Sequence, residues 1–174
     1  MQPIRILPAQ AVHYPQIQRL NSQAIPHVNH LSRGDLEKLA KQSRFFLVAI
    51  DGQEQVAAFL LALDQRADYA SPNFRYFADH YEQFLYIDRI VVHTDHQRQG
   101  LGKSLYQAIV EKTGEEFSLL TCEVNLRPPN PISLEFHRGC GFSGVHEQET
   151  EQGSKRVLLM TRPFGSLESH GGTS

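Results

Sequence analysis

Apolar residues recur along the chain at two spacings, which predict strands and helices in alternation. Short apolar or alternating runs are typical of strands. The expected strands cover residues 4–7, 45–50, 56–63, 85–92, 119–124, 142–147 and 155–161. Between the second and third of these, Asp51-Gly52 is a signal for a two-residue hairpin turn, so we expect those strands to pair antiparallel.

Helices are expected where apolar residues recur every three to four positions. The expected helices cover residues 12–24, 32–43, 101–114 and 131–137. Ser32 is a suitable N-terminal cap for the second helix, and Gly114 suits the end of the third. Pro131 suits the first turn of the fourth.

The order of these elements draws attention to a βαβ unit and to a long segment without a predicted element. The strand at 85–92, the helix at 101–114 and the strand at 119–124 form a βαβ unit, so the two strands are expected to be parallel. Residues 64–83 are rich in aromatic side chains and broken by Pro72, and no regular element is expected there. A segment of this length inside a compact domain is often functional.

Composition narrows the class of protein. The 174 residues are 40% hydrophobic, enough for one sizeable core, and the net charge of −2 offers no basic face for nucleic acid. The longest apolar run, at 56–63, is far shorter than the roughly 20 residues that cross a bilayer. No signal peptide is visible, and two cysteines are too few for a disulfide framework. We therefore expect a reduced, cytoplasmic protein with one domain over 1–162 and a flexible tail over 163–174.

A phosphate site is predicted at the sequence Gln97-Arg98-Gln99-Gly100-Leu101-Gly102, where a strand leads into a helix. Backbone N–H groups and the helix dipole favour an anion there, and Arg98 and Lys103 add positive charge. A P-loop would need glycine at 97, and a dinucleotide fingerprint would need glycine at 105. These positions hold Gln97 and Leu105. On this segment alone, a glycine-rich helix start without a ligand is the alternative.

Two parts of the sequence resemble the GNAT N-acetyltransferase family. The strand at 87–93, followed by the glycine segment at 97–102, is similar to that family's acetyl-CoA signature. Downstream, the family's segment Asn-x-x-Ala-x-x-(Phe/Leu)-Tyr-x-x-x-Gly-Phe is matched by Asn130, Ser133, Phe136, Gly141 and Phe142. His137 stands where the family has its Tyr. The order of elements agrees from 4 to 161, so the resemblance covers nearly the whole chain.

The resemblance implies an α/β fold with a mixed, mostly antiparallel central sheet, a splayed pair of parallel strands and flanking helices. It implies acetyl-CoA as cosubstrate, with the pyrophosphate on the backbone at 97–102. A backbone N–H on the first splayed strand would polarise the thioester carbonyl, which contributes roughly 3 kcal/mol. The residues that the resemblance places at the cofactor are Ile90, Val91, Val92, Gln97, Arg98, Gln99, Gly100, Leu101, Gly102, Lys103, Ser104, Asn125, Asn130 and Phe136.

Acetyl transfer to an amine needs a base, and the leaving thiolate takes up a proton. Asp88 and Glu123 are candidate bases because both lie on the two central strands, and pairing with a nearby arginine is the alternative for each. His137 is a candidate acid, and a contact to CoA or the surface, or no functional role, are its other interpretations. Tyr86 and Tyr106 are alternative acids if they face the thioester. A thiol pKa of about 8.5 makes the thiolate a fair leaving group without much help.

The acceptor site is expected between residues 25–32 and the aromatic segment at 64–81. Its candidate walls are Tyr69, Asn73, Phe74 and Tyr76, and ordinary packing under a long loop explains the same residues equally well. His93 and His96 are three residues apart, but no cysteine or acidic cluster nearby completes a zinc set, so no metal is expected.

The leading hypothesis is therefore an acetyltransferase that acts directly on a primary amine of a small-molecule or peptide acceptor in a ternary complex. No nucleic-acid or membrane partner is expected. The alternative is a non-catalytic module of the same fold that senses CoA or an acyl-CoA. Homodimers through the last strands are common in the resembled family. The apolar run at 157–160 is thus expected either in the core or shared with a second copy.

Overall fold

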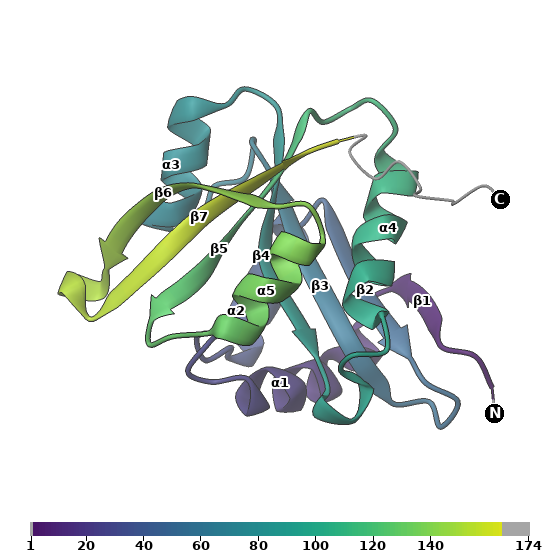
Figure 1. The fold of residues 1–174 in the computed structure, drawn as a ribbon. Coiled ribbons are helices and arrows are strands. Elements are labelled where there is room, and N and C mark those ends of the chain that lie inside the picture. Colours follow the sequence, from purple (N-terminus) through teal and green to yellow (C-terminus); the bar gives the residue numbers. More distant parts are fainter. Residues whose placement is uncertain (1, 165–174) are drawn as a thin grey trace, which may run out of the picture.

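A computed structural model describes residues 2–164, in which a seven-stranded sheet lies between two groups of helices (Figure 1). The strands are β1 (Arg5–Pro8), β2 (Phe45–Ile50), β3 (Val56–Asp64), β4 (Phe84–Val92), β5 (Leu119–Arg127), β6 (Ser143–Thr150) and β7 (Lys155–Pro163). Their order in the sheet is β1-β2-β3-β4-β5-β7-β6, and every neighbouring pair is antiparallel except β4 and β5. The mixed sheet expected from the sequence is confirmed.

The helices divide between the two faces of the sheet. They are α1 (Tyr14–Gln23), α2 (Arg33–Gln42), α3 (Pro72–His80), α4 (Leu101–Thr113) and α5 (Pro131–Gly139), with short 3-10 turns η1 (Ala11–His13), η2 (Thr94–His96) and η3 (Glu151–Gly153). The apolar side chains of α1, α2 and α3 pack on one face, and those of α4 and α5 pack on the other. The central strands are thus buried on both sides, which explains the unbroken apolar run of β3.

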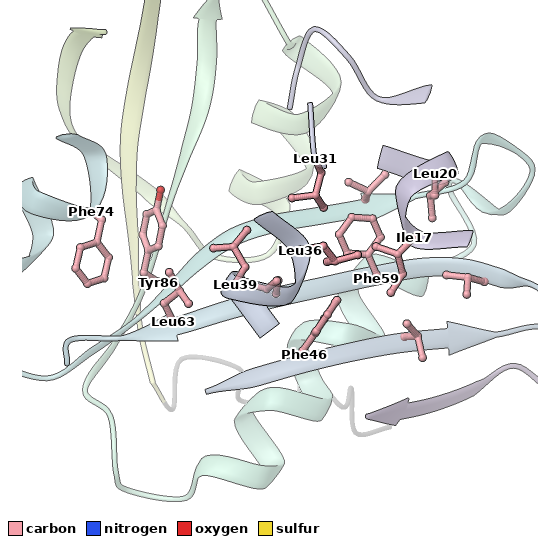
Figure 2. Packing of buried hydrophobic residues seen from close by; sticks show 14 of the residues in the cluster. Ile17, Leu20, Leu31, Leu36, Leu39, Phe46, Phe59, Leu63, Phe74 and Tyr86 are labelled. Carbon is pink, nitrogen blue, oxygen red and sulfur yellow. The ribbon is translucent and has the colours of Figure 1, made fainter. Parts of the chain in front are cut away.

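The α1–α2 side of the core is built from helix residues spaced three to four apart (Figure 2). Ile17 of α1 and Leu36 of α2 are fully buried beside Phe59 of β3. The same cluster continues through Phe74 of α3 to Tyr86 of β4, so the three helices share one apolar layer.

β4 and β5 are hydrogen-bonded only where they begin. They pair at Phe84–Leu119, Leu85–Leu120 and Tyr86–Thr121, and among the described residues they do not pair beyond that point. β4 continues along β3 to Val92, while β5 continues along β7 to Arg127. The two strands therefore diverge, as Figure 1 shows, and the parallel, splayed pair expected from the sequence is confirmed.

Two local predictions were wrong. The connection between β2 and β3 covers residues 51–55 rather than a two-residue turn, because the Asp51 carboxylate accepts hydrogen bonds from the N–H groups of Gln53 and Gln55. The segment at 64–83 contains α3, in which Pro72 starts the helix instead of breaking one. The Ser71 hydroxyl caps this helix by accepting from the N–H of Asn73.

The C-terminal part of the sheet also extends past its expected limits. β5 runs through Asn125 to Arg127, beyond the end expected at residue 124. Pro163 pairs with Leu119, and the N–H of Phe164 donates to the Ser118 carbonyl, so the first residues of the predicted tail join the sheet. The rest of that predicted tail, 165–174, lies outside the described residues. β7 is paired on both sides, which accounts for the apolar run at 157–160 as a core strand.

Candidate active site

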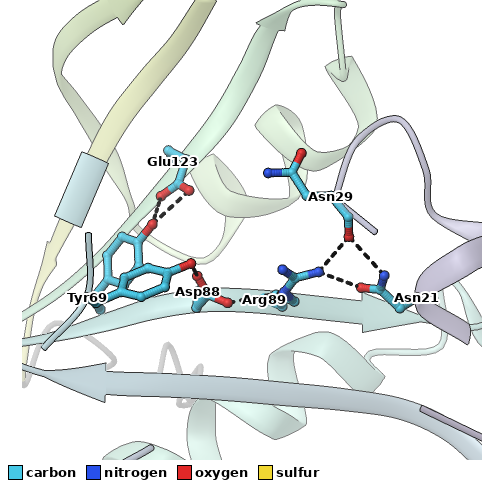
Figure 3. Close-up of polar contacts among 7 residues, drawn as sticks. Asn21, Asn29, Tyr69, Asp88, Arg89 and Glu123 are labelled. Atoms are coloured by element: carbon cyan, nitrogen blue, oxygen red, sulfur yellow. Dashed lines mark hydrogen bonds and ion pairs between the residues drawn. The ribbon is translucent and has the colours of Figure 1, made fainter. Parts of the chain in front are cut away.

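β4 carries a bulge at the level where it leaves β5. Leu61 of β3 pairs with Arg89, and Ala62 pairs with Ile87, so within the described sheet Asp88 has no partner on β3. A bulge interrupts the regular alternation of side chains along a strand. Asp88 and Arg89 accordingly both face the α1–α3 side, where their hydrogen-bond partners lie (Figure 3).

Glu123 of β5 lies on the same side, two residues after the last β4–β5 pair. The Tyr86 hydroxyl donates to both of its carboxylate oxygens, at 2.8 and 2.7 Å. Burial raises the pKa of Glu123 to about 8, and the nearby charge of Asp88 adds to that increase. Hydrogen bonding from Tyr86 acts in the opposite direction. Glu123 is therefore a carboxyl group that gains and loses its proton near pH 8.

Asp88 has a different environment, although it lies close by. The Tyr69 hydroxyl donates to Oδ1 at 2.6 Å, and Arg89 Nε donates to Oδ2 at 3.2 Å. The Asp88 side chain is 5% exposed and that of Arg89 is 10% exposed. The two carboxylates thus share a face but not their partners, as Figure 3 shows.

The four residues predicted to line the acceptor site have separate places. Tyr69 faces Asp88, and the Asn73 side chain accepts a hydrogen bond from Gln148 of β6 at 2.6 Å while lowering the pKa of Glu123. Phe74 is buried in the core, and Tyr76 stacks on His146 with ring centroids 4.7 Å apart. Tyr69 and Asn73 are therefore at the carboxylates, whereas Phe74 is a packing residue.

The glycine segment joins η2 to α4 and is exposed from Gln97 to Gly100. Gly100 has a φ of +77°, and a Cβ built on it would meet nothing within 4 Å in the described chain. At Gly102, by contrast, a Cβ would lie 2.6 Å from Cζ of Phe136. Gly100 thus leaves open space at the start of α4, while Gly102 makes room for the ring of Phe136.

The other residues predicted at the cofactor border this segment or the end of β5. Lys103 is exposed, and the Ser104 hydroxyl donates to the Gly100 carbonyl at 3.0 Å. Asn130 caps α5 by accepting from the N–H of Ser133. The Asn125 amide donates to the His27 carbonyl at 3.3 Å, which joins β5 to the segment between α1 and α2.

His137 lies between α5 and α4, and both of its ring nitrogens have partners. Nδ1 is 2.8 Å from the Ser133 carbonyl oxygen, which only accepts, so this nitrogen carries the proton. Nε2 is 2.7 Å from the Tyr106 hydroxyl and therefore accepts from it. Burial lowers the pKa of His137, so the ring is neutral at pH 7.

These features can be compared with known proteins. The Acetyltransferase (GNAT) family matches residues 14–142 of the sequence. The chain belongs to this family. The family resemblance seen in the sequence is therefore confirmed, and it makes the protein a member of an acetyltransferase family. A comparison with curated protein sequences gives no match.

Three solved structures illustrate which folds are similar to this GNAT chain. The ribosomal-protein-S18-alanine N-acetyltransferase from Escherichia coli has a TM-score of 0.68 at 15% identity and covers 99% of this chain and 100% of its own. Ard1 from Thermoplasma volcanium has a TM-score of 0.74 at 15% identity, with 92% and 97% covered. Arabidopsis thaliana NAA60 in complex with acetyl-CoA has a TM-score of 0.73 at 12% identity, with 92% and 99% covered. At such identities the likeness shows the fold.

Sequence reasoning about this GNAT domain missed Asn21, which is fully buried and accepts a hydrogen bond from Arg89 Nη1 at 3.0 Å. The signal was a polar residue within the apolar stripe that Ile17 and Leu20 define on α1.

Among residues 2–164, no helix has the length and apolarity to span a membrane. Over the same residues, no cluster of three or more His, Cys, Asp or Glu side chains is arranged to hold a metal ion.

Proposed function

We propose that this GNAT protein transfers an acetyl group from acetyl-CoA directly to a primary amine of a small-molecule or peptide acceptor. The observation that carries the proposal is the position of Glu123, a carboxyl with a pKa of about 8, where β4 and β5 diverge. A general base takes a proton most efficiently when its pKa is close to the working pH. Family membership supports the acyl-transfer chemistry.

The cofactor residues of the proposal lie along one path from β4 to α4. Ile90, Val91 and Val92 are on the part of β4 that has left β5, so an edge of that strand faces away from β3. Acetyl-CoA, when bound, would supply an activated acetyl group. The backbone along this edge would orient the pantetheine arm, as a neighbouring strand would be oriented.

The pyrophosphate of the cofactor would lie at the start of α4. The backbone of Gln97, Arg98, Gln99, Gly100, Leu101 and Gly102 would hold it, and Gly100 leaves room for close approach. The helix dipole and the charges of Arg98 and Lys103 favour an anion there. Ser104, Asn125, Asn130 and Phe136 border the same path in the proposal.

Glu123 is the proposed base. Its carboxylate would take one proton of the acceptor ammonium, and the neutral nitrogen would then bond to the acetyl carbon while the carbon–sulfur bond breaks. The nitrogen loses its second proton to solvent as the amide forms, and the CoA thiolate takes up a proton from solvent. The pKa of Glu123, about 8, lies between the usual carboxyl range and that of a primary amine, so the transfer is not strongly uphill. The hydroxyl of Tyr86 holds the carboxylate in place.

For His137 we propose a structural role instead of the general acid role that its place in the motif predicts. A neutral ring that accepts from Tyr106 at Nε2 is not arranged to donate a proton. A CoA thiolate, with a thiol pKa of about 8.5, can leave without such a donor. His137 and Tyr106 then serve to hold α5 against α4.

The test is acetyl transfer to a panel of primary amines by the wild type and by Glu123→Gln. We expect kcat to fall by about 100-fold or more, as for loss of a general base, with the Kd for acetyl-CoA within about twofold. Glu115→Gln is the matched control, because Glu115 is exposed beyond the end of α4.

Two outcomes would count against the proposal. An unchanged kcat in Glu123→Gln would remove Glu123 as the base. CoA binding without turnover of any amine would favour the sensor hypothesis instead.

A further inference from the structure

The second buried carboxylate, Asp88, has its hydrogen-bond partners in Tyr69 and Arg89, whose other contacts lead away from Glu123. Both of its oxygens already accept hydrogen bonds, one from Tyr69 and one from Arg89. Arg89 forms an ion pair with it at 3.2 Å. Glu123, in contrast, has its hydrogen bonds from Tyr86 and Asn73, and its pKa is elevated.

The Arg89 side of this cluster reaches the segment between α1 and α2. Arg89 Nη1 donates to the Asn29 carbonyl at 2.7 Å and to the Asn21 side chain at 3.0 Å. The Asn21 amide donates to the same Asn29 carbonyl at 3.0 Å. Figure 3 shows these three groups as a closed triangle of hydrogen bonds. The backbone at residue 29 is therefore fixed to β4 through one guanidinium.

The Tyr69 side of the cluster reaches the segment between β3 and α3. Tyr69 donates to Asp88 at 2.6 Å, and its ring packs against Phe74 and Tyr86, with centroids 5.8 and 6.2 Å away. The segment leads directly into α3, which Ser71 caps and Pro72 begins. The position of Tyr69 thus sets how residues 65–71 approach the diverging strands.

We propose that Asp88 and Arg89 are positioning residues that fix the two acceptor-side segments, 24–32 and 65–71, to the bulge of β4. The inference rests on the proposed function for the claim that these segments border the acceptor. The bulge is what makes the arrangement possible, because consecutive residues of a regular strand would face opposite sides of the sheet. The two carboxylates of the site then have separate tasks: Glu123 takes the proton, and Asp88 shapes the place where the acceptor lies.

The experiment combines amide hydrogen exchange with steady-state kinetics on Asp88→Asn. This variant keeps the side-chain shape but removes the charge that pairs with Arg89. We expect faster exchange in both 24–32 and 65–71, and a KM for the acceptor raised about tenfold, as for loss of one hydrogen bond to a charged group. We expect the plateau value of kcat to change by less than about threefold, with the rising limb of the pH profile retained but moved to lower pH.

Tyr69→Phe separates the two branches and remains informative if Asp88→Asn unfolds. It removes the donor to Oδ1 alone, so exchange should accelerate in 65–71 and stay unchanged in 24–32. Glu54→Gln is the control, because it removes an exposed carboxylate that pairs with Arg5 at the β2–β3 connection.

Two results would overturn the inference. Unchanged exchange in both segments of Asp88→Asn would show that the contacts do not hold them. A fall in kcat of about 100-fold with loss of the rising limb would make Asp88 the base. Because exchange needs no turnover, a wild type without transferase activity would refute the proposed function and leave the positioning claim still decided by exchange.

Discussion

Glu123 illustrates how neighbouring groups determine the chemistry of a single side chain. Burial gives the largest effect and raises its pKa to about 8. Tyr86 and Asn73 lower that pKa through hydrogen bonds, Arg89 lowers it through its charge, and Asp88 raises it through repulsion. Apart from burial, these opposing contributions come from residues of β4 and from Asn73 of α3. They make the pKa adjustable in both directions.

Opposite shifts are therefore expected from two substitutions beside Glu123. A base acts when ionised, so kcat/KM should rise with pH through the pKa of Glu123, near 8. Tyr86→Phe removes a hydrogen bond to the carboxylate and should move that rise to higher pH. Asp88→Asn removes a repelling charge and should move it to lower pH. The measurement is the pH profile of kcat/KM, and shifts of the same sign in both variants would contradict this account.

At the scale of elements, the start of α4 depends on a contact with α5. The ring of Phe136 occupies the space where Gly102 would carry a side chain, 2.6 Å from the position of a Cβ. Gly102→Ala forces the ring or the helix to move, and overpacking of this kind costs about 1–3 kcal/mol. We expect a lower unfolding temperature, partly restored when Phe136→Leu is added.

Gly34→Ala is the matched control for that prediction. Gly34 lies in α2, and a Cβ there meets nothing within 4 Å in the described chain. Alanine is a better helix former than glycine by roughly 0.5–1 kcal/mol, so this change should stabilise the protein. Thermal unfolding measures both variants, and a Gly102→Ala protein as stable as the wild type would show that the contact is not tight.

The strands and most helices follow from the sequence because their periodicity is local. α3 was missed because Pro72 suggests a break, although Ser71-Pro72 is the sequence signal of a capped helix that begins with proline. The bulge at Asp88, by contrast, could not be predicted, because it depends on the register between β4 and β3. Their place on the two central strands was enough to select Glu123 and Asp88 as candidates, but their different partners come from tertiary contacts with Tyr86 and Tyr69.

At the scale of the whole molecule, the diverging strands β4 and β5 lie between two layers of helices. Helices α4 and α5 cover one face and border the glycine segment, while α1, α2 and α3 cover the face that holds both carboxylates. In the proposed function, the cofactor approaches along the first layer and the acceptor along the second. The opening of β4 from β5 beyond Tyr86 is the feature that would let them meet.

Thermal unfolding with acetyl-CoA, CoA, ATP and NAD, each at the same concentration, tests this account most directly. A ligand at 100 times its Kd stabilises a fold by about 2.7 kcal/mol, which for a chain of this size raises the midpoint by several degrees. The account predicts such a shift with acetyl-CoA, whether or not CoA also gives one, and no shift with ATP or NAD. No response to either CoA species, or a shift only with ATP or NAD, would contradict it.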